Sequence, residues 1–225
     1  MRVAIFDLDG TLADTSADLI ASANATLAEL GQPGLLDPLA DRAIAFAGGR
    51  AMLREGLARA RIAEPGLVDR LYPRLLDLYE AAVAVHTRPY ERAEEALDIL
   101  AAAGWKLGIC TNKPERLALI LIEELGLTRH FAVLLGADSL PVKKPDPRHL
   151  LETIARVGGT PGRSVLVGDT ITDRDTARAA GVPCVLVGFG PDGGAVLALE
   201  PEAIVPHYDD LPELLERLVP RALGE

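Results

Sequence analysis

The sequence contains few of the residues that build disulfide frameworks or thiolate metal sites. Its 225 residues include two cysteines and four histidines. Cys110 and Cys184 each lie in an apolar run typical of a strand, which indicates buried thiols in a reducing compartment better than a disulfide. Because the sequence has no cluster of histidines or cysteines, a zinc site is not expected.

Basic residues are scarce relative to acidic ones. The chain has 23 lysines and arginines against 33 aspartates and glutamates, which gives a formal net charge of −10 at pH 7. A negative protein is repelled by a phosphate backbone, so nucleic acid is not expected as a partner. Hydrophobic residues at 49% and charged residues at 25% are close to the average of globular proteins, which argues against a disordered or fibrous chain.

Long hydrophobic runs are missing as well. Apolar runs such as Leu117–Ile122 are far shorter than the roughly 18 residues of a membrane span, so no membrane segment is expected. Asp7 interrupts the first apolar run, and the charged and apolar regions of a secretion signal are therefore missing. We expect the protein to remain in the cytoplasm.

What the sequence does contain is an alternation of short β-rich runs with longer helical patterns. This alternation predicts parallel strands joined by helical crossovers, that is, an α/β fold with a Rossmann-like doubly wound parallel sheet. The expected strands are residues 3–6, 106–111, 132–136, 164–168, 183–188 and 203–205. The expected crossover helices, each followed by a glycine, are residues 91–103, 114–125 and 147–157.

A long helical segment is inserted between the first two strands. About a hundred residues separate these strands, whereas a crossover connection needs about a dozen. Residues 16–85 show apolar positions at helical spacing throughout. The sequence therefore predicts two domains, a core formed by residues 1–13 and 87–225 and a small α-helical domain formed by residues 14–86.

Polar side chains follow the core strands. Asp7 and Asp9 come directly after the first strand, and residues i and i+2 of an extended chain point to the same side. The polar residues at the other strand ends are Thr111 and Asn112, Lys144, and Asp169 with Asp173. Each of these alone also fits an ordinary polar loop. Because open α/β sheets bind ligands at the carboxyl ends of their strands, four such ends in register predict one shared site.

The charges of these residues predict a metal ion and a phosphate. The four aspartates at positions 7, 9, 169 and 173 carry −4 into one crevice, which is costly unless cations compensate it. A divalent ion and one lysine supply +3, and carboxylate oxygens are ligands that suit Mg²⁺. The hydroxyl of Thr111 and the ammonium of Lys144 would then bind a phosphate dianion.

These segments resemble the four motifs of the haloacid dehalogenase superfamily, in the same order and over nearly the whole core. The segments are Asp7-Leu8-Asp9-Gly10-Thr11, Thr111-Asn112, Lys144-Pro145 and residues 168–173. Residues 111–116 and 143–147 are in addition similar to the phosphoglycolate phosphatase subgroup. The helical insert resembles the cap domain of the superfamily.

The resemblance implies a role for each motif residue. Asp7 would be the nucleophile and Asp9 the general acid and base, with Thr111 and Lys144 completing the catalytic set. The implied metal ligands are Asp7, Asp9, Asp169 and Asp173. The implied substrate-binding residues are Thr111, Asn112 and Lys144 in the core, and Gly49 and Arg50 in the insert. Arg50 could pair with a substrate carboxylate, and a solvated arginine at a helix start is the alternative.

The function that we expect from the sequence is that of a hydrolase. It would be a Mg²⁺-dependent phosphatase that cleaves a small phosphate monoester, phosphoglycolate first, through an aspartyl-phosphate intermediate. Its partner would be a small phosphorylated metabolite, and the sequence leaves the oligomeric state open. The alternatives are a phosphomutase of the β-phosphoglucomutase type, a phosphatase for a phosphosugar, a phosphate-binding module without catalysis, and an NAD-dependent oxidoreductase.

The oxidoreductase alternative depends on the segment 188–193. Its glycine spacing matches a dinucleotide-binding fingerprint, and it follows an expected strand. The helical pattern after it, residues 195–200, is short and stops at Pro201, whereas a nucleotide site needs a long helix there. We therefore expect this segment to be a loop at the rim of the crevice.

Overall fold

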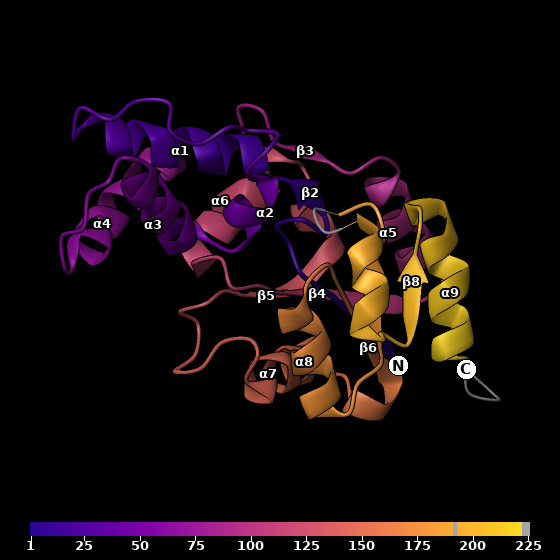
Figure 1. Ribbon diagram of the computed structural model, residues 1–225. Helices are drawn as coiled ribbons and strands as arrows, with labels where there is room; N and C mark the ends of the chain where they lie inside the picture. The colour runs from indigo at the N-terminus through magenta and orange to yellow at the C-terminus, as the bar shows by residue number, and fades with distance from the viewer. Residues whose placement is uncertain (191–192, 222–225) are drawn as a thin grey trace. The chain divides into compact units, whose positions relative to one another are not determined.

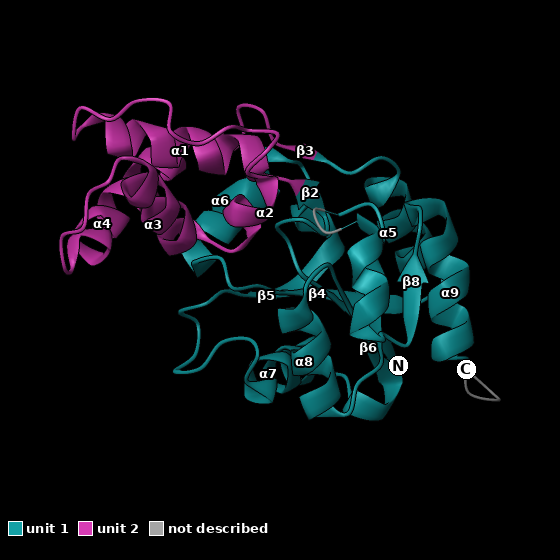
Figure 2. Cartoon of the chain, viewed as in Figure 1, with its two compact units in different colours: residues 1–13, 89–225 teal, residues 14–88 magenta. Residues whose placement is uncertain are grey.

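The computed structural model, which describes residues 1–190 and 193–221, divides into two units (Figure 2). Unit 1 consists of residues 1–13 and 89–225, and unit 2 consists of residues 14–88. The chain passes from one unit to the other through two short strands that pair with each other, β2 (Ala13–Asp14) and β3 (Arg88–Pro89). Each unit buries its own hydrophobic cluster.

A six-stranded parallel sheet forms the centre of unit 1 (Figure 1). The strands are β1 (Arg2–Phe6), β4 (Trp105–Cys110), β5 (Phe131–Leu135), β6 (Ser164–Gly168), β7 (Cys184–Val187) and β8 (Ala203–Val205). Their order is β5-β4-β1-β6-β7-β8. The chain therefore begins near the middle of the sheet, adds β4 and β5 on one side of β1, and then adds β6, β7 and β8 on the other side. The predicted doubly wound parallel sheet is thereby confirmed, and its carboxyl ends form one edge.

Helices cover both faces of this sheet. They are α5 (Ala93–Ala102), α6 (Glu115–Glu124), α7 (Pro147–Val157), α8 (Ile171–Ala180) and α9 (Leu211–Leu218). Short 3₁₀ turns are η1 (Thr128–His130), η2 (Pro161–Arg163), η3 (Gly193–Leu199) and η4 (Tyr208–Asp210). Helices α7 and α8 contact each other and the central strands, and α5 contacts α9. Since both faces are covered, the strands need continuous apolar sequences, which is the pattern that predicted them.

Helix α7 shows how local sequence sets the ends of an element. The Asp146 side chain accepts a hydrogen bond from the backbone N–H of Arg148 at 3.0 Å, and Pro147 occupies the first turn. Gly158 ends the helix at a φ of 88°, a left-handed conformation that glycine adopts without strain. The helix therefore begins and ends where the sequence predicts.

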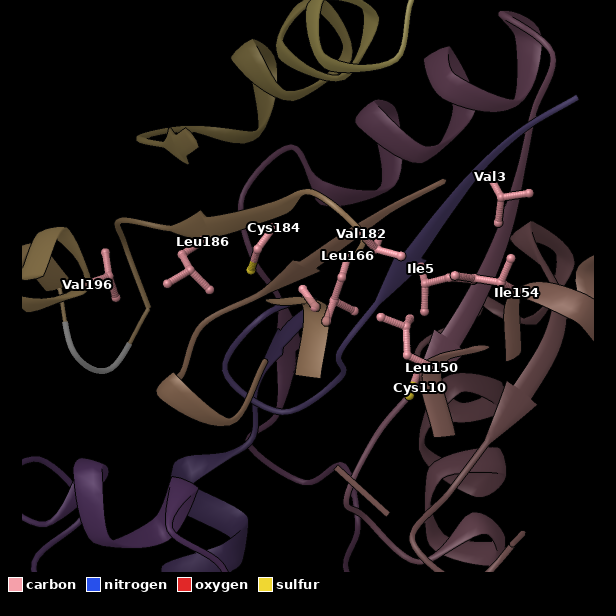
Figure 3. Packing of buried hydrophobic residues seen from close by; sticks show 11 residues of the cluster. Val3, Ile5, Cys110, Leu150, Ile154, Leu166, Val182, Cys184, Leu186 and Val196 are labelled. Atoms are coloured by element: carbon pink, nitrogen blue, oxygen red, sulfur yellow. The ribbon is translucent and has the colours of Figure 1, made fainter. Parts of the chain in front are cut away.

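One hydrophobic cluster of unit 1 lies between the sheet and helices α7 and α8 (Figure 3). Val3 and Ile5 of β1 meet Leu150 and Ile154 of α7, and all four are buried. Cys110 and Cys184 belong to the same cluster and are free, buried thiols, as the sequence predicts. Burial of this kind stabilises a fold by about 25 cal/mol per Å² of apolar surface.

Unit 2 is a group of four helices. They are α1 (Ser16–Ala28), α2 (Arg42–Phe46), α3 (Gly49–Arg59) and α4 (Leu67–Glu80). Helices α1 and α3 approach closely at Gly56, where a Cβ would lie 2.2 Å from Cδ1 of Leu27. Asp18 of α1 accepts hydrogen bonds from the backbone N–H groups of His86 and Thr87, at 2.9 and 2.8 Å, and so ties the returning chain to the first helix. Within the described residues, no helix has the length and apolarity needed to cross a bilayer.

Candidate active site

The carboxyl edge of the unit 1 sheet gathers the polar residues that follow its strands. The backbone N–H of Asp7, after β1, donates to the carbonyl of Val167 in β6 at 2.9 Å. The backbone N–H of Thr111, after β4, donates to the carbonyl of Leu135 in β5 at 3.0 Å. Because β1 lies between β4 and β6, these bonds hold the ends of neighbouring strands at one place.

Lys144 is the centre of the site. Its ammonium lies 2.6 Å from Oδ1 of Asp173 and 2.9 Å from Oδ2 of Asp7, and the residue is buried. Burial opposes the charge, but the two carboxylates raise the pKa of Lys144 above its ordinary value, so the ammonium is retained. The side-chain amide of Asn112 donates to the backbone carbonyl of Lys144 at 2.9 Å and holds the lysine loop in place.

Three carboxylates surround this ammonium. Oxygens of Asp7, Asp169 and Asp173 all lie within 4.8 Å of one another. Burial raises the pKa of Asp7 to about 6. Burial, with Asp173 and Asp7 beside it, raises the pKa of Asp169 well above the ordinary range. With all three carboxylates ionised, the group and Lys144 carry −2 in total, and a divalent cation is the simplest compensation for that charge.

The oxygens of these carboxylates are not equally available. Oδ2 of Asp173 accepts the hydroxyl and backbone N–H of Thr170, at 2.8 and 3.2 Å, which caps helix α8, and Oδ1 faces Lys144. Oδ1 of Asp169 accepts the hydroxyl of Thr11 at 2.9 Å. Oδ2 of Asp169 is buried and has no hydrogen-bond partner in residues 1–190 and 193–221. An orphaned buried oxygen beside two other carboxylates fits a hard divalent cation.

Gly168 makes room for this arrangement. A Cβ at this position would lie 2.4 Å from Cγ of Asp173, far inside van der Waals contact. The absence of a side chain at the end of β6 lets Asp173, one turn into α8, fold back toward the sheet edge. A glycine is therefore required before Asp169, because any side chain at position 168 would overlap Asp173.

Lys113 is a site residue that the sequence prediction omits. Its ammonium contacts both oxygens of Asp9, at 3.0 and 3.2 Å, and its side chain is only 3% exposed. The available signal was its position two residues after Thr111, in the polar segment that follows β4. The structure therefore pairs the proposed acid and base with a buried cation.

Gly49 and Arg50 lie in unit 2. The Arg50 guanidinium donates to Asp69 at 3.0 Å and stacks over the ring of Tyr72, with its carbon 3.7 Å from the ring centroid. A Cβ at Gly49 would lie 3.0 Å from a carbon of the Tyr72 ring, so a side chain there would require that ring to shift by a few tenths of an ångström. Their contact with substrate stays a prediction.

Gly190, in the glycine-rich segment after β7, lies against the site. A Cβ at Gly190 would lie 3.1 Å from the carbonyl oxygen of Gly10 and 3.3 Å from Cβ of Asp169. Pro191 and Asp192, which complete the fingerprint spacing, lie outside the described residues. The chain then forms the 3₁₀ turn η3 in place of the long helix of a dinucleotide site. Gly190 therefore lies in close contact with both aspartate loops.

Comparison with known proteins agrees with this geometry. Residues 4–187 match the family of haloacid dehalogenase-like hydrolases. The chain is 46% identical over 224 residues to a phosphoglycolate phosphatase of Mesorhizobium japonicum, covering 99% of this chain and 98% of that protein. It is 43% identical over 220 residues to a phosphoglycolate phosphatase of Agrobacterium fabrum, covering 96% of this chain and 94% of that protein.

Solved structures share the fold at lower identity. A predicted phosphoglycolate phosphatase of Haemophilus somnus superposes with a TM-score of 0.85 at 23% identity, covering 95% of this chain and 97% of that one. A provisionally assigned β-phosphoglucomutase of Thermotoga maritima superposes with a TM-score of 0.75 at 24% identity, covering 96% of this chain and 99% of that one. At these identities the likeness establishes the fold.

Proposed function

Because the chain belongs to the family of haloacid dehalogenase-like hydrolases, we propose that it hydrolyses a small phosphate monoester through an aspartyl-phosphate intermediate. The observation that carries this proposal is the ammonium of Lys144 held 2.9 Å from Asp7, beside an Asp169 oxygen that lacks a partner among the described residues. That arrangement offers a nucleophile, a phosphate-binding cation and a metal ligand at one strand edge.

The chemistry follows from the residues present. With a pKa of about 6, the Asp7 carboxylate is ionised at neutral pH and can attack phosphorus, forming a bond to the phosphoryl group as the ester bond breaks. Asp9 donates a proton to the departing alkoxide and then removes one from the attacking water. Lys144 and Thr111 hold the phosphoryl oxygens during both displacements. Release of inorganic phosphate restores free Asp7.

We propose Mg²⁺ as the metal ion, with Asp7 and Asp169 as its side-chain ligands. When bound, the ion supplies positive charge that stabilises the phosphoryl oxygens. Asp173 and Asp9 stay predictions as ligands, since their oxygens already accept hydrogen bonds from Lys144 and Thr170, and from Lys113. Asp173 would then act by fixing Lys144. The helical unit 2 would serve as the cap, with Gly49 and Arg50 toward the substrate.

Phosphoglycolate is the substrate that we propose. Relatives 46% and 43% identical over nearly the whole chain are named phosphoglycolate phosphatase. Lys113 provides an independent reason. Asp9 must contact the ester oxygen that it protonates, and Lys113 lies 3.0 Å from Asp9. In phosphoglycolate a single methylene separates that oxygen from a carboxylate, which brings the carboxylate within reach of this ammonium.

The direct test is release of inorganic phosphate from 2-phosphoglycolate, measured with Mg²⁺ and after removal of the metal by EDTA. We expect release to fall at least about 100-fold on chelation and to return on adding Mg²⁺. The same assay with β-glucose 1-phosphate distinguishes the mutase alternative, which would form glucose 6-phosphate. Tight phosphate binding without turnover of any small monoester would contradict the proposal and indicate a binding module.

Removing the Lys113 charge is expected to change selectivity. For Lys113→Met, kcat/KM for 2-phosphoglycolate should fall about 100-fold, because hydrogen bonds between charged groups contribute roughly 1.5–3 kcal/mol. Catalysis on 2-hydroxyethyl phosphate, which has an uncharged hydroxyl in place of the carboxylate, should fall much less. Lys113→Arg serves as the charge-retaining control. Equal losses on both substrates would mean that Lys113 acts only through Asp9.

A further inference from the structure

Two buried hydrogen bonds connect Tyr208, through Thr11, to the carboxylate of Asp169. The Tyr208 hydroxyl, in the turn η4 after β8, donates to the backbone carbonyl of Thr11 at 2.7 Å. The hydroxyl of Thr11 donates to Oδ1 of Asp169 at 2.9 Å. Tyr208 and Thr11 are both 0% exposed, so water does not compete for either bond.

This chain determines which Asp169 oxygen is left for a cation. Oδ1 is occupied by Thr11, and Oδ2 is the atom without a partner among the described residues. The Thr11 hydroxyl keeps its direction only if the loop that carries it is fixed. Backbone bonds to Leu8 hold one side of that loop, and the Tyr208 hydroxyl holds the carbonyl on the other.

Tyr208 is in turn held by aromatic packing and by an ion pair. Its ring centroid lies 5.2 Å from that of Phe189, which lies 5.0 Å from that of Tyr90. The neighbouring Asp209 accepts from Nε of Arg92 at 2.9 Å. Phe189 belongs to the glycine-rich segment after β7, whose Gly190 contacts the aspartate loops. Phe189 and Gly190 therefore connect the ring of Tyr208 to the loop of Asp169.

We propose that Tyr208 is a positioning residue for the divalent-metal site, acting through Thr11 on Asp169. This inference rests on the proposed function, because it assigns a role toward the metal that the phosphatase uses. Residues that orient metal ligands through a hydrogen bond typically change metal affinity 10- to 100-fold when removed. Thr11 makes the direct bond to Asp169, and Tyr208 fixes Thr11 although 197 positions separate the two residues in the chain.

The test is Tyr208→Phe, which removes the hydroxyl and keeps the ring against Phe189. We expect the Mg²⁺ dissociation constant, measured by calorimetry on the substrate-free protein, to weaken about tenfold or more. At saturating Mg²⁺, kcat should return to within about threefold of wild type. Ser164→Ala is the matched control, because it removes the hydroxyl of another buried residue, which donates to the carbonyl of Thr160 at 2.7 Å at the opposite edge of the same sheet.

A double-variant comparison separates positioning from general destabilisation. Thr11→Val removes the bond to Asp169 directly, so adding Tyr208→Phe to it should weaken Mg²⁺ binding no further. Independent losses that add in the double variant would overturn the proposal, as would a Tyr208→Phe protein that binds Mg²⁺ as tightly as Ser164→Ala. With either outcome, the proposed function would stand as long as the wild-type protein binds Mg²⁺ and releases phosphate. A wild-type protein without Mg²⁺ binding or phosphate release would overturn both.

Discussion

Asp7→Asn is expected to abolish turnover, with phosphate release lowered by about 10⁴-fold or more and no covalent phosphoenzyme formed. An amide oxygen is a poor nucleophile, and no covalent intermediate can then divide the displacement into two steps. Loss of a nucleophile that works as part of a catalytic unit typically removes almost all of the catalysis. The measurement is phosphate release from 2-phosphoglycolate, together with acid trapping of labelled phosphoenzyme.

The same substitution should not unfold the protein. Burial raises the pKa of Asp7 to about 6, which means that the ionised form opposes folding in the metal-free protein. Neutral asparagine removes that cost, so the melting temperature in EDTA should be no lower than that of wild type. Asp175→Asn, at an exposed position of α8, is the control and should keep full activity. Turnover by Asp7→Asn above about one hundredth of wild type would exclude Asp7 as the nucleophile.

Lys144→Met is expected to have the second largest effect, on both catalysis and stability. Without the ammonium, Asp7, Asp169 and Asp173 carry −3 in place of −2 into the same buried volume. Removing one partner of a buried ion pair costs about 3–5 kcal/mol, because the other charges are left uncompensated. Phosphate also loses its binding cation, so kcat/KM should fall about 10³-fold or more.

The stability loss in Lys144→Met should depend on pH in a defined direction. Asp7 and Asp169 already have raised pKa values, so protonation relieves the repulsion between them. Their contribution to stability is present at low pH and is lost as pH rises through the folded-state pKa, which for Asp7 is about 6. Denaturant unfolding in EDTA should therefore show a larger deficit for the variant at pH 8 than at pH 5.

The neighbouring lysine provides the control for this experiment. Lys143 is exposed, whereas Lys144 is buried, so Lys143→Met changes the net charge equally without entering the cluster. It should retain both stability and activity. A Lys144→Met protein with the same deficit at both pH values would show that the lysine does not compensate the carboxylates.

Local patterns were sufficient to predict the elements of the core. Residues 147–157 and 164–168 were expected as a helix and a strand, and they are α7 and β6 with those bounds. A strand covered on both faces requires a continuous apolar run, and a helix carries its own start and stop residues. The positions of Asp7 and Asp169 at strand ends follow from the same segments. The apolar runs and the helix start and stop residues each lie within a short segment, so they can be recognised from the sequence alone.

Partners of individual side chains could not be predicted in this way. The motif predicts Asp7, Asp9, Asp169 and Asp173 around one metal ion, and it does not indicate that Lys144 and Thr170 contact the two oxygens of Asp173. The fold pairs Asp9 with Lys113, 104 positions away. The stacking of Arg50 on Tyr72 is likewise a contact that the sequence does not indicate. No short sequence pattern indicates any of these contacts.

The amino-acid sequence is therefore enough to assign the α/β core, the edge where the motif residues gather and the family, because hydrophobic period and motif spacing are local. The folded chain is needed to know which carboxylate oxygens remain for a cation and that Tyr208 contacts Thr11. Those contacts depend on distances of a few ångströms between residues far apart in the chain. The order of the strands in the sheet sets these distances, and no short segment contains both partners.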